Sequence, residues 1–305
     1  MSPDTLSQNG VRGTSFMGNI SLLGLPRRIW LKGCRQWGFH QYLSPLVPAP
    51  QGRKWVFLVG AYNSGTTLLN TLLGQHPSIS TLPYEGVALA SKLDRPEDYG
   101  WPRMWHKCIE HLGPRPGEGA QVAQRSLREW GMCFDRSKLV FVEKSIVNAV
   151  RIPWLIQHFQ PAYFIHMVRN GYAVAEGIQR RTNGQAPGGQ YSIADCAYQW
   201  AEANRIVRES LVEYPRALTV YYEDLAEDPL AQLARIAAFL ELDNEWTSNI
   251  SELKVHGVTA PLNNQNPRRL ARLCQGDLEA IEAAAGEELA RYGYGRPIPT
   301  GKREE

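Results

Sequence analysis

The chain has 305 residues, a mass of 34.3 kDa and a formal net charge of +3, and 43% of its residues are apolar and 21% charged. This composition is ordinary for a soluble globular protein with a sizeable core. No run approaches the roughly 18 consecutive apolar residues of a membrane-spanning helix, so such a helix is excluded. Five scattered cysteines, an odd number without metal-like spacing, argue against a disulfide framework and predict a reducing, cytoplasmic location.

The amino-terminal part of the chain is basic. Residues 1–54 carry seven Lys or Arg side chains and one acidic side chain, which leaves a charge of −3 for the rest of the chain. Solvent exposure is the default explanation of such a segment, and we expect no nucleic-acid partner. The sequence therefore predicts a basic extension over residues 1–53, with disorder over residues 1–18.

The segment 20–39 mixes Leu, Ile, Trp and Phe with Arg and Lys. This pattern predicts one of two structures: an interfacial amphipathic helix in peripheral contact with a membrane, or a segment that packs on the main domain. Gly24, Pro26 and Gly33 interrupt any long helix, which favours packing on the domain.

The stretch from Trp55 to Pro77 is the most informative part of the sequence. An apolar run that ends at Val59 predicts a buried strand, and leucines at three- and four-residue spacing after Gly65 predict a helix. Between these elements, Gly60 and Gly65 have the GxxxxG spacing of a P-loop. The first turn of such a helix has N–H groups without partners and carries partial positive charge. The stretch therefore predicts an anion-binding cradle.

One position departs from the pattern of nucleotide triphosphatases. Thr66 stands where those proteins place the lysine that binds the β- and γ-phosphates. A cradle without that lysine suits a less charged group than a triphosphate, and phosphosulfate is such a group. The structural alternative is a tight strand-to-helix turn that binds no ligand.

Residues 87–137 have the least regular pattern. Helical pieces are expected at about 103–112 and 119–133. Three tryptophans of this region either line a groove for an acceptor molecule or fill a core, and both alternatives stay open. They are Trp101, Trp105 and Trp130.

Strands and helices alternate through the rest of the chain. Strands are expected at 139–142, 162–168 and 217–222, and helices at about 148–159, 172–181, 192–214, 229–240 and 277–290. The loop 183–190 has the composition of a flexible lid. Because strands separated by helices indicate right-handed βαβ crossovers, we predict an α/β fold with a P-loop-type parallel sheet flanked by helices. The expected domain covers residues 54–295, and a polar tail follows at 296–305.

In open parallel sheets, ligands bind at the carboxyl ends of the strands. In this sequence those ends carry the P-loop, the run Glu143-Lys144-Ser145, Arg169 and Tyr222. An anion cradle, two cations and an aromatic ring are therefore expected at one edge of the sheet, where they would form a nucleotide site.

These motifs in this order resemble the sulfotransferases that use 3′-phosphoadenosine 5′-phosphosulfate (PAPS). The motifs are GAYNSGTTLL followed by HP, then EKS, FIHMVRNG and VYYEDL followed by DP. The sequence is most similar to the carbohydrate and tyrosylprotein branches, in a bacterial type, and the resemblance covers roughly residues 55–242. It implies a sulfotransferase fold and transfer of a sulfuryl group from PAPS to a hydroxyl of a carbohydrate, lipid or tyrosine acceptor.

The resemblance also implies roles for individual residues. Arg169 matches an arginine that binds the 3′-phosphate, and Arg181 matches a second basic contact of the tyrosylprotein branch. Tyr222 matches a tyrosine near the adenosine, and Lys144 matches a lysine beside the sulfuryl group. Backbone N–H groups, helped by hydroxyl groups, would hold the 5′-phosphosulfate at Ser64, Gly65, Thr66, Thr67 and Leu68.

Three further positions bear on catalysis. Glu85 lies about where the tyrosylprotein branch has its catalytic glutamate, displaced by one residue, and a glutamate that caps the next helix from Gly86 is the alternative. Asn63 replaces the Arg or Lys that assists the leaving phosphate in the family, so it offers a hydrogen bond without charge. Gly177 replaces a serine of the family and removes one contact to the 3′-phosphate.

Two other functions are compatible with parts of the pattern. A P-loop kinase or other nucleotide-binding protein is opposed by Thr66 and by the lack of a clear magnesium-binding pattern. A non-catalytic PAPS-binding module is favoured by Asn63, Gly177 and the basic extension. The histidines lack ligand partners at recognisable spacing, so we expect no metal.

Overall fold

The apolar run that follows Lys54 forms the central strand of a parallel sheet. The computed structural model describes residues 26–82, 84–246, 253–255, 258–260 and 263–298. Within them, β1 is buried along all but its first residue and pairs on both sides, which is the environment that a continuous apolar strand requires. Val56, for example, lies opposite Val142 on one side and Tyr163 on the other.

Five parallel strands make up the main sheet in the order β2-β3-β1-β4-β5. A separate antiparallel pair is formed by β6 and β7. The strands are β1 (Lys54–Gly60), β2 (Ile79–Thr81), β3 (Val140–Lys144), β4 (Ala162–Val168), β5 (Ala217–Tyr221), β6 (Leu253–Val255) and β7 (Val258–Ala260).

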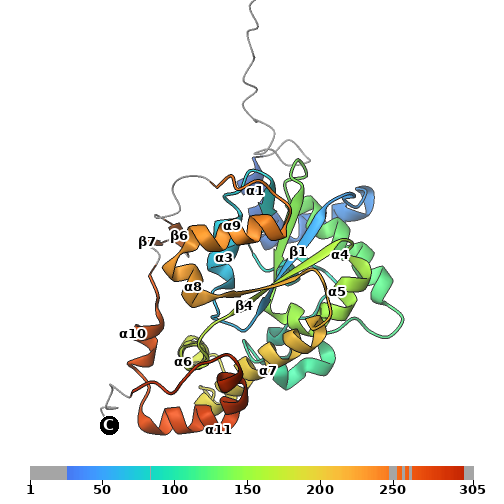
Figure 1. Cartoon of the computed structure of the whole chain (residues 1–305). Coiled ribbons are helices and arrows are strands. Elements are labelled where there is room, and N and C mark those ends of the chain that lie inside the picture. Colours follow the sequence, from blue (N-terminus) through green and yellow to red (C-terminus); the bar gives the residue numbers. More distant parts are fainter. Residues whose placement is uncertain (1–25, 83, 247–252, 256–257, 261–262, 299–305) are drawn as a thin grey trace, which may run out of the picture.

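Helices cover both faces of the main sheet, as Figure 1 shows. On one face, Val56 and Leu58 of β1 pack in a cluster with residues of α3, α8 and α9; on the other, Trp55 and Phe57 join the larger core formed with α4 to α7 and α11. The helices are α1 (Arg27–Trp37), α2 (Phe39–Leu43), α3 (Thr66–Leu73), α4 (Gly119–Cys133), α5 (Ile152–His158), α6 (Gly171–Thr182), α7 (Ile193–Leu211), α8 (Tyr222–Glu227), α9 (Pro229–Phe239), α10 (Asn266–Leu270) and α11 (Gln275–Arg291).

The predicted α/β fold is confirmed, and several elements have the expected bounds. Helix α4 covers 119–133 and β4 covers 162–168, as the sequence indicates. Helix α7 begins after Ser192, whose hydroxyl accepts a hydrogen bond from the N–H of Asp195 at 3.0 Å. Local signals therefore placed these elements correctly, because an apolar run or a capping side chain marks each boundary.

Several elements differ from the expectation. The helix expected at about 148–159, for example, begins at Ile152, after a 3₁₀ helix over Ile146–Arg151. Strand β3 continues through Lys144, since its pairing with β1 extends to the Leu58–Lys144 register. Strand β5 ends at Tyr221, and Tyr222 begins the short helix α8. A loop was expected before the last helix, but α10 forms there from Asn266, with Pro267 in its first turn.

The amino-terminal segment packs on the domain. Trp30, Leu31 and Cys34 of α1 are buried, and the indole N–H of Trp30 donates to the Met132 carbonyl at 2.8 Å. The expected packing is thus confirmed for residues 27–37, whereas the expected interruption at Gly33 is wrong. Gly33 lies inside α1, where the Phe39 side chain packs against it. The disorder expected for residues 1–18 concerns positions outside the described residues.

Two of the three tryptophans in the irregular region belong to the core. Trp105 and Trp130 are fully buried, and the Trp130 indole donates to the Gly86 carbonyl at 2.8 Å. Trp101 is half-buried and stacks on Tyr191 with ring centroids 6.4 Å apart. Across the described ranges, no helix is both long and apolar enough to cross a membrane.

Candidate functional site

The strands of the main sheet run parallel, so their carboxyl ends lie at one edge of the sheet and bring the expected polar groups there. The loop after β1 lies between the ends of β3 and β4, because β1 pairs with both strands. Lys144 is the last residue of β3, Arg169 follows β4, and Tyr222 follows β5. The parallel topology therefore assembles residues that are far apart in the sequence around one loop.

Glycine is required at both ends of that loop. Gly60 has φ +144°, and a Cβ there would overlap the Met167 carbonyl oxygen of the neighbouring strand. Gly65 has φ +106°, and its Cβ would stand 2.8 Å from Cδ2 of Tyr222. Any side chain would both strain the backbone and push the loop off the sheet edge. Glycine is therefore needed at both positions of the GxxxxG motif, because the loop packs tightly against β4 and α8.

Asn63 occupies the left-handed region of the backbone, with φ +62°. Asparagine tolerates this conformation better than most residues, which gives a local reason for its presence at this position. Its carbonyl oxygen accepts a hydrogen bond from Nη1 of Arg169 at 3.0 Å. The turn therefore directs its backbone oxygen to the arginine and leaves the side-chain amide on the side of α6, close to Gly177.

Buried polar atoms around the loop lack partners. Among the described residues, Asn63 Nδ2, Ser64 Oγ and Arg169 Nη2 make no hydrogen bond. Buried polar groups are rarely left unpaired in a native protein, because each costs roughly 1–3 kcal/mol. Two of the three atoms are donors and the third is a hydroxyl, so together they suit an anionic ligand. Helix α3 also begins here without a side-chain cap.

Arg169 is fixed on all sides but one. Its Nε donates to Asn266 Oδ1 at 2.7 Å, and its guanidinium carbon lies 3.8 Å from the centroid of the Tyr222 ring. Asn266 in turn donates to Glu223 at 2.6 Å. Burial lowers the pKa of Arg169 below its ordinary value. The structure thus leaves Nη2 as the group that can reach a ligand, while the other nitrogens hold the guanidinium in place.

Lys144 and Glu85 meet at the first turn of α3. The Lys144 Nζ lies 3.0 Å from Glu85 Oε1 and 3.5 Å from the Thr67 hydroxyl. Glu85 precedes the 3₁₀ helix Gly86–Leu89, but its side chain makes no capping hydrogen bond in this described segment. The capping alternative for Glu85 is therefore wrong.

Other side chains accept hydrogen bonds from the first N–H groups of that 3₁₀ helix. The Gly86 N–H donates to the Glu143 carboxylate at 2.8 Å, and the Val87 N–H donates to the Ser145 hydroxyl at 3.0 Å. Glu143 is fully buried and also accepts hydrogen bonds from Ser145 and Asn148. Burial raises the pKa of Glu143 to about 7. Glu143 and Ser145 thus fix the backbone beside Glu85 and leave the Glu85 carboxylate at the site.

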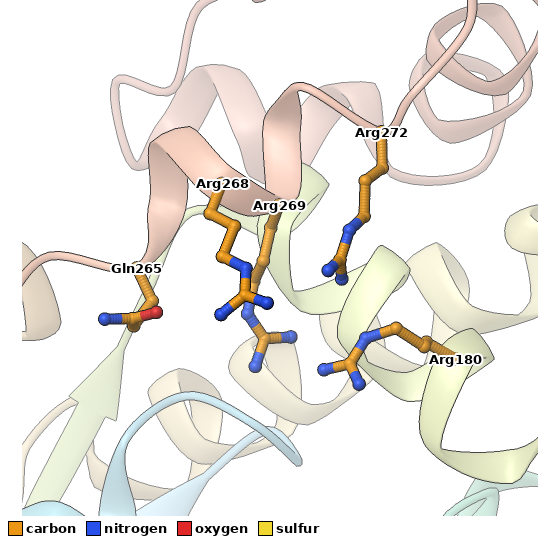
Figure 2. A pocket seen from close by; sticks show the side chains of 5 residues that line it. All are labelled: Arg180, Gln265, Arg268, Arg269 and Arg272. Atoms are coloured by element: carbon orange, nitrogen blue, oxygen red, sulfur yellow. The ribbon is translucent and has the colours of Figure 1, made fainter. Parts of the chain in front are cut away.

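A cluster of arginines forms a second part of the site (Figure 2). A hollow of about 110 Å³ is lined by Gln265 and by four arginines whose guanidinium groups point into it: Arg180, Arg268, Arg269 and Arg272. A single carboxylate, Glu176, pairs with three of these arginines at 2.8–3.5 Å. Positive charge therefore exceeds negative charge in this hollow, as an anion-binding site requires.

Arg269 connects the arginine cluster to the loop. Its pKa is lowered to about 10, first by burial and then by the positive charge of Arg169. A Cβ at Gly177 would overlap Nη1 of Arg269 and would lie 3.3 Å from Cγ of Asn63. Because Gly177 has no side chain, the Arg269 guanidinium can occupy the space beside the Gly177 backbone.

The structure brings most of the predicted site residues together and separates one. Four predicted residues lie around the loop and the first turn of α3, which residues 63–68 form. They are Glu85, Lys144, Arg169 and Tyr222. Arg181, in contrast, is exposed near the end of α6. Partial burial and then the positive charges of Arg103 and Arg180 lower the pKa of Arg181, so it lies at the border of the arginine cluster.

Sequence reasoning missed Asn266 and the three arginines that follow it. They lie on or just after α10, in a stretch expected to be a loop. The run Asn266-Pro267-Arg268-Arg269 was the available signal, since proline favours the first turn of a helix and paired arginines favour an anion.

The chain is similar to known proteins over more than half of its length. Residues 56–248 match a family model described as the Sulfotransferase family. A curated protein of Caenorhabditis briggsae, described as a putative protein-tyrosine sulfotransferase, is 25% identical over 191 residues. That match spans 61% of this chain and 65% of the relative, which is less than two thirds of its length.

Solved structures share the fold. A sulfotransferase domain from the olefin synthase of Synechococcus PCC 7002 aligns with a TM-score of 0.54 at 20% identity, over 83% of this chain and 98% of that domain. A sulfotransferase domain from the curacin biosynthetic pathway aligns with a TM-score of 0.53 at 16% identity, over 82% of this chain and 99% of that domain.

Proposed function

Because this chain belongs to the sulfotransferase family, we propose that it transfers the sulfuryl group of PAPS to a hydroxyl group of an acceptor. The observation that carries the proposal is the set of unpartnered polar atoms around the loop, Asn63 Nδ2, Ser64 Oγ and Arg169 Nη2, beside a surplus of arginine charge. A ligand with anionic groups at two separated positions would satisfy both parts of the site. PAPS has this property, since it carries a 5′-phosphosulfate and a 3′-phosphate.

The residues around the loop fit the 5′-phosphosulfate end. The backbone N–H groups and hydroxyls of residues 64–68, at the first turn of α3, would hold the phosphosulfate. Lys144, at the end of β3, lies beside Thr67 of this turn. Arg169 and Arg269 would hold the 3′-phosphate. Burial and then the positive charge of Arg169 lower the pKa of Arg269, which supports a pair of neighbouring guanidinium groups at this place. Tyr222, which stacks on Arg169, would border the adenosine.

The transfer would use three groups of the protein. Glu85 would accept the proton of the acceptor hydroxyl as the new oxygen–sulfur bond forms. The bond between sulfur and the bridging oxygen would break, and its electron pair would stay on the 5′-phosphate. Lys144 and the N–H groups of α3 would stabilise this negative charge. The ion pair between Lys144 and Glu85, at 3.0 Å, supports the proposal because it keeps base and cation side by side.

The alternative functions are less well supported. A kinase would need a cation for the β- and γ-phosphates at position 66, which is a threonine. The non-catalytic module was favoured by Asn63 and Gly177, yet Arg269 brings positive charge next to both positions. We propose a carbohydrate, lipid or tyrosine hydroxyl as the acceptor, in a cytoplasmic enzyme whose catalytic domain covers residues 54–295.

Ligand binding tests the proposed function directly. PAPS and adenosine 3′,5′-bisphosphate should raise the melting temperature of the full chain, because each binds the folded state alone. At a hundred times its dissociation constant, the ligand should add about 2.7 kcal/mol to the free energy of unfolding. Differential scanning fluorimetry with ATP as the comparison ligand measures this effect. Stabilisation by ATP alone would contradict the proposal.

Gly177→Ala tests the role of Arg269. Alanine suits the interior of α6, but its Cβ would displace the Arg269 guanidinium. We expect the dissociation constant of adenosine 3′,5′-bisphosphate to rise on the order of ten- to a hundredfold, since a charged hydrogen bond is lost. Calorimetry measures this dissociation constant, and Arg269→Ala should raise it by a similar factor.

The matched control for this substitution is Gly286→Ala. Gly286 also lies in a helix, and a Cβ there would meet no atom within 4 Å. The Gly286→Ala variant should bind adenosine 3′,5′-bisphosphate with the affinity of the wild type. An unchanged affinity of a folded Gly177→Ala variant would remove Arg269 from the proposed site.

Glu85→Gln tests the proposed base. The amide cannot accept the acceptor's proton, so kcat for sulfuryl transfer from radiolabelled PAPS should fall by roughly 10²–10⁴. The affinity for adenosine 3′,5′-bisphosphate should stay near the wild-type value, because Glu85 forms its ion pair with Lys144 and none with the arginine cluster in the described structure. Turnover close to that of the wild type would show that another group accepts the proton.

The outer face of the basic extension supports contact with an anionic membrane surface. Trp37, Phe39, Tyr42 and Leu46 are exposed by 48–81%, close to Lys32 and Arg35 in the chain. Vesicles that contain anionic lipid should sediment the protein, and replacing Trp37 and Phe39 together by Ser should weaken this binding. Equal sedimentation with neutral and anionic vesicles would contradict the proposal.

A further inference from the structure

A buried cluster outside the nucleotide site contains two cysteines and one histidine. Cys34 lies on α1, His40 on α2 and Cys133 at the end of α4, and all three residues are at most 2% exposed. One ligand atom of each residue lies within 4.8 Å of those of the other two. Three metal-binding side chains from three helices therefore converge in one buried space.

The histidine is oriented as a metal ligand. Its Nε2 lies 2.5 Å from the Leu89 carbonyl oxygen, which can only accept, so Nε2 carries the proton. The other ring nitrogen, Nδ1, then has a free lone pair. This atom is fully buried, and in the described part of the chain the Cys34 thiol is the side chain that interacts with the ring on this side. Metal-binding histidines commonly donate their second N–H to a backbone carbonyl, as His40 does.

We propose that Cys34, His40 and Cys133 bind a structural zinc ion. Two thiolates and one neutral imidazole are ligands that zinc prefers, and bond lengths of about 2.0–2.3 Å would fit between atoms this close. Binding releases the two thiol protons, and the two thiolates then neutralise the charge of Zn²⁺, so no net charge is buried. The described residues supply three ligands, and a water molecule would complete the tetrahedron.

The zinc site would join the amino-terminal helices to the core and to the short 3₁₀ helix that follows Glu85. Cys34 and His40 belong to the basic extension, Cys133 ends a core helix, and the histidine also contacts Leu89 in the 3₁₀ helix that follows Glu85. Arg27 strengthens the same junction by donating to the Cys133 carbonyl at 3.1 Å. The ion would thus hold together segments that are far apart in the sequence.

A disulfide between the two cysteines is the competing chemistry. It would use Cys34 and Cys133 but would leave Nδ1 of His40 buried and without a partner. An unpaired buried nitrogen costs free energy, whereas a metal ion satisfies all three side chains. The geometry therefore favours zinc over a disulfide.

Metal analysis tests the proposal without reference to sulfuryl transfer. The full chain, produced without a histidine tag in zinc-supplemented medium and purified under a phosphine reductant, should contain about one zinc ion per chain by mass spectrometry of the elements. Cys34→Ser and Cys133→Ser should lose this zinc. Cys108→Ser should retain it, because Cys108 is equally buried but outside the cluster.

A second measurement on the wild type covers variants that fail to fold. Removal of zinc with a chelator should lower the melting temperature, and addition of zinc alone should restore it. Wild-type protein that contains no zinc, or that contains copper or iron in its place, would overturn the proposal. Peptide mapping that finds a Cys34–Cys133 disulfide in the purified wild type would also overturn it.

Discussion

The structure depends on one electrostatic constraint: guanidinium groups gather at the carboxyl edge of the sheet with too few carboxylates to balance them. Among these groups Arg169 is buried, and the Arg269 side chain is only 11% exposed. Glu176 is shared by three arginines, and Glu223 reaches Arg169 only through Asn266. Burial and mutual repulsion lower the pKa of Arg269 to about 10. A protein keeps such an arrangement at a cost in stability, and an anionic ligand removes the cost.

The same constraint explains two departures from the family pattern. Asn63 brings no charge and Gly177 brings no side chain, and each change alone would weaken an anion site. In space the two positions are neighbours, and the Arg269 guanidinium occupies the volume that Gly177 leaves empty. In the proposed PAPS site the two changes would therefore act together, with an arginine from α10 supplying the charge.

The segments that surround the site are fixed by polar contacts at their backbones. Glu143 and Ser145 hold the N–H groups of Gly86 and Val87, and His40 holds the carbonyl of Leu89. These contacts keep the short helix after Glu85 in one position, so that the Glu85 carboxylate can face Lys144. Positioning by buried side chains is more exact than a surface loop could achieve, because burial makes each lost hydrogen bond costly.

The sequence by itself determined the parallel sheet, the loop between Gly60 and Gly65, and the convergence of Lys144, Arg169 and Tyr222. These features follow from local periodicity and from the rule that parallel strands end at one edge. Only the tertiary structure decided that Arg269 lies against Gly177 and that Cys133 lies beside Cys34. Such contacts join segments that are distant in the chain, and no local spacing records them because they depend on how helices pack across the crossovers.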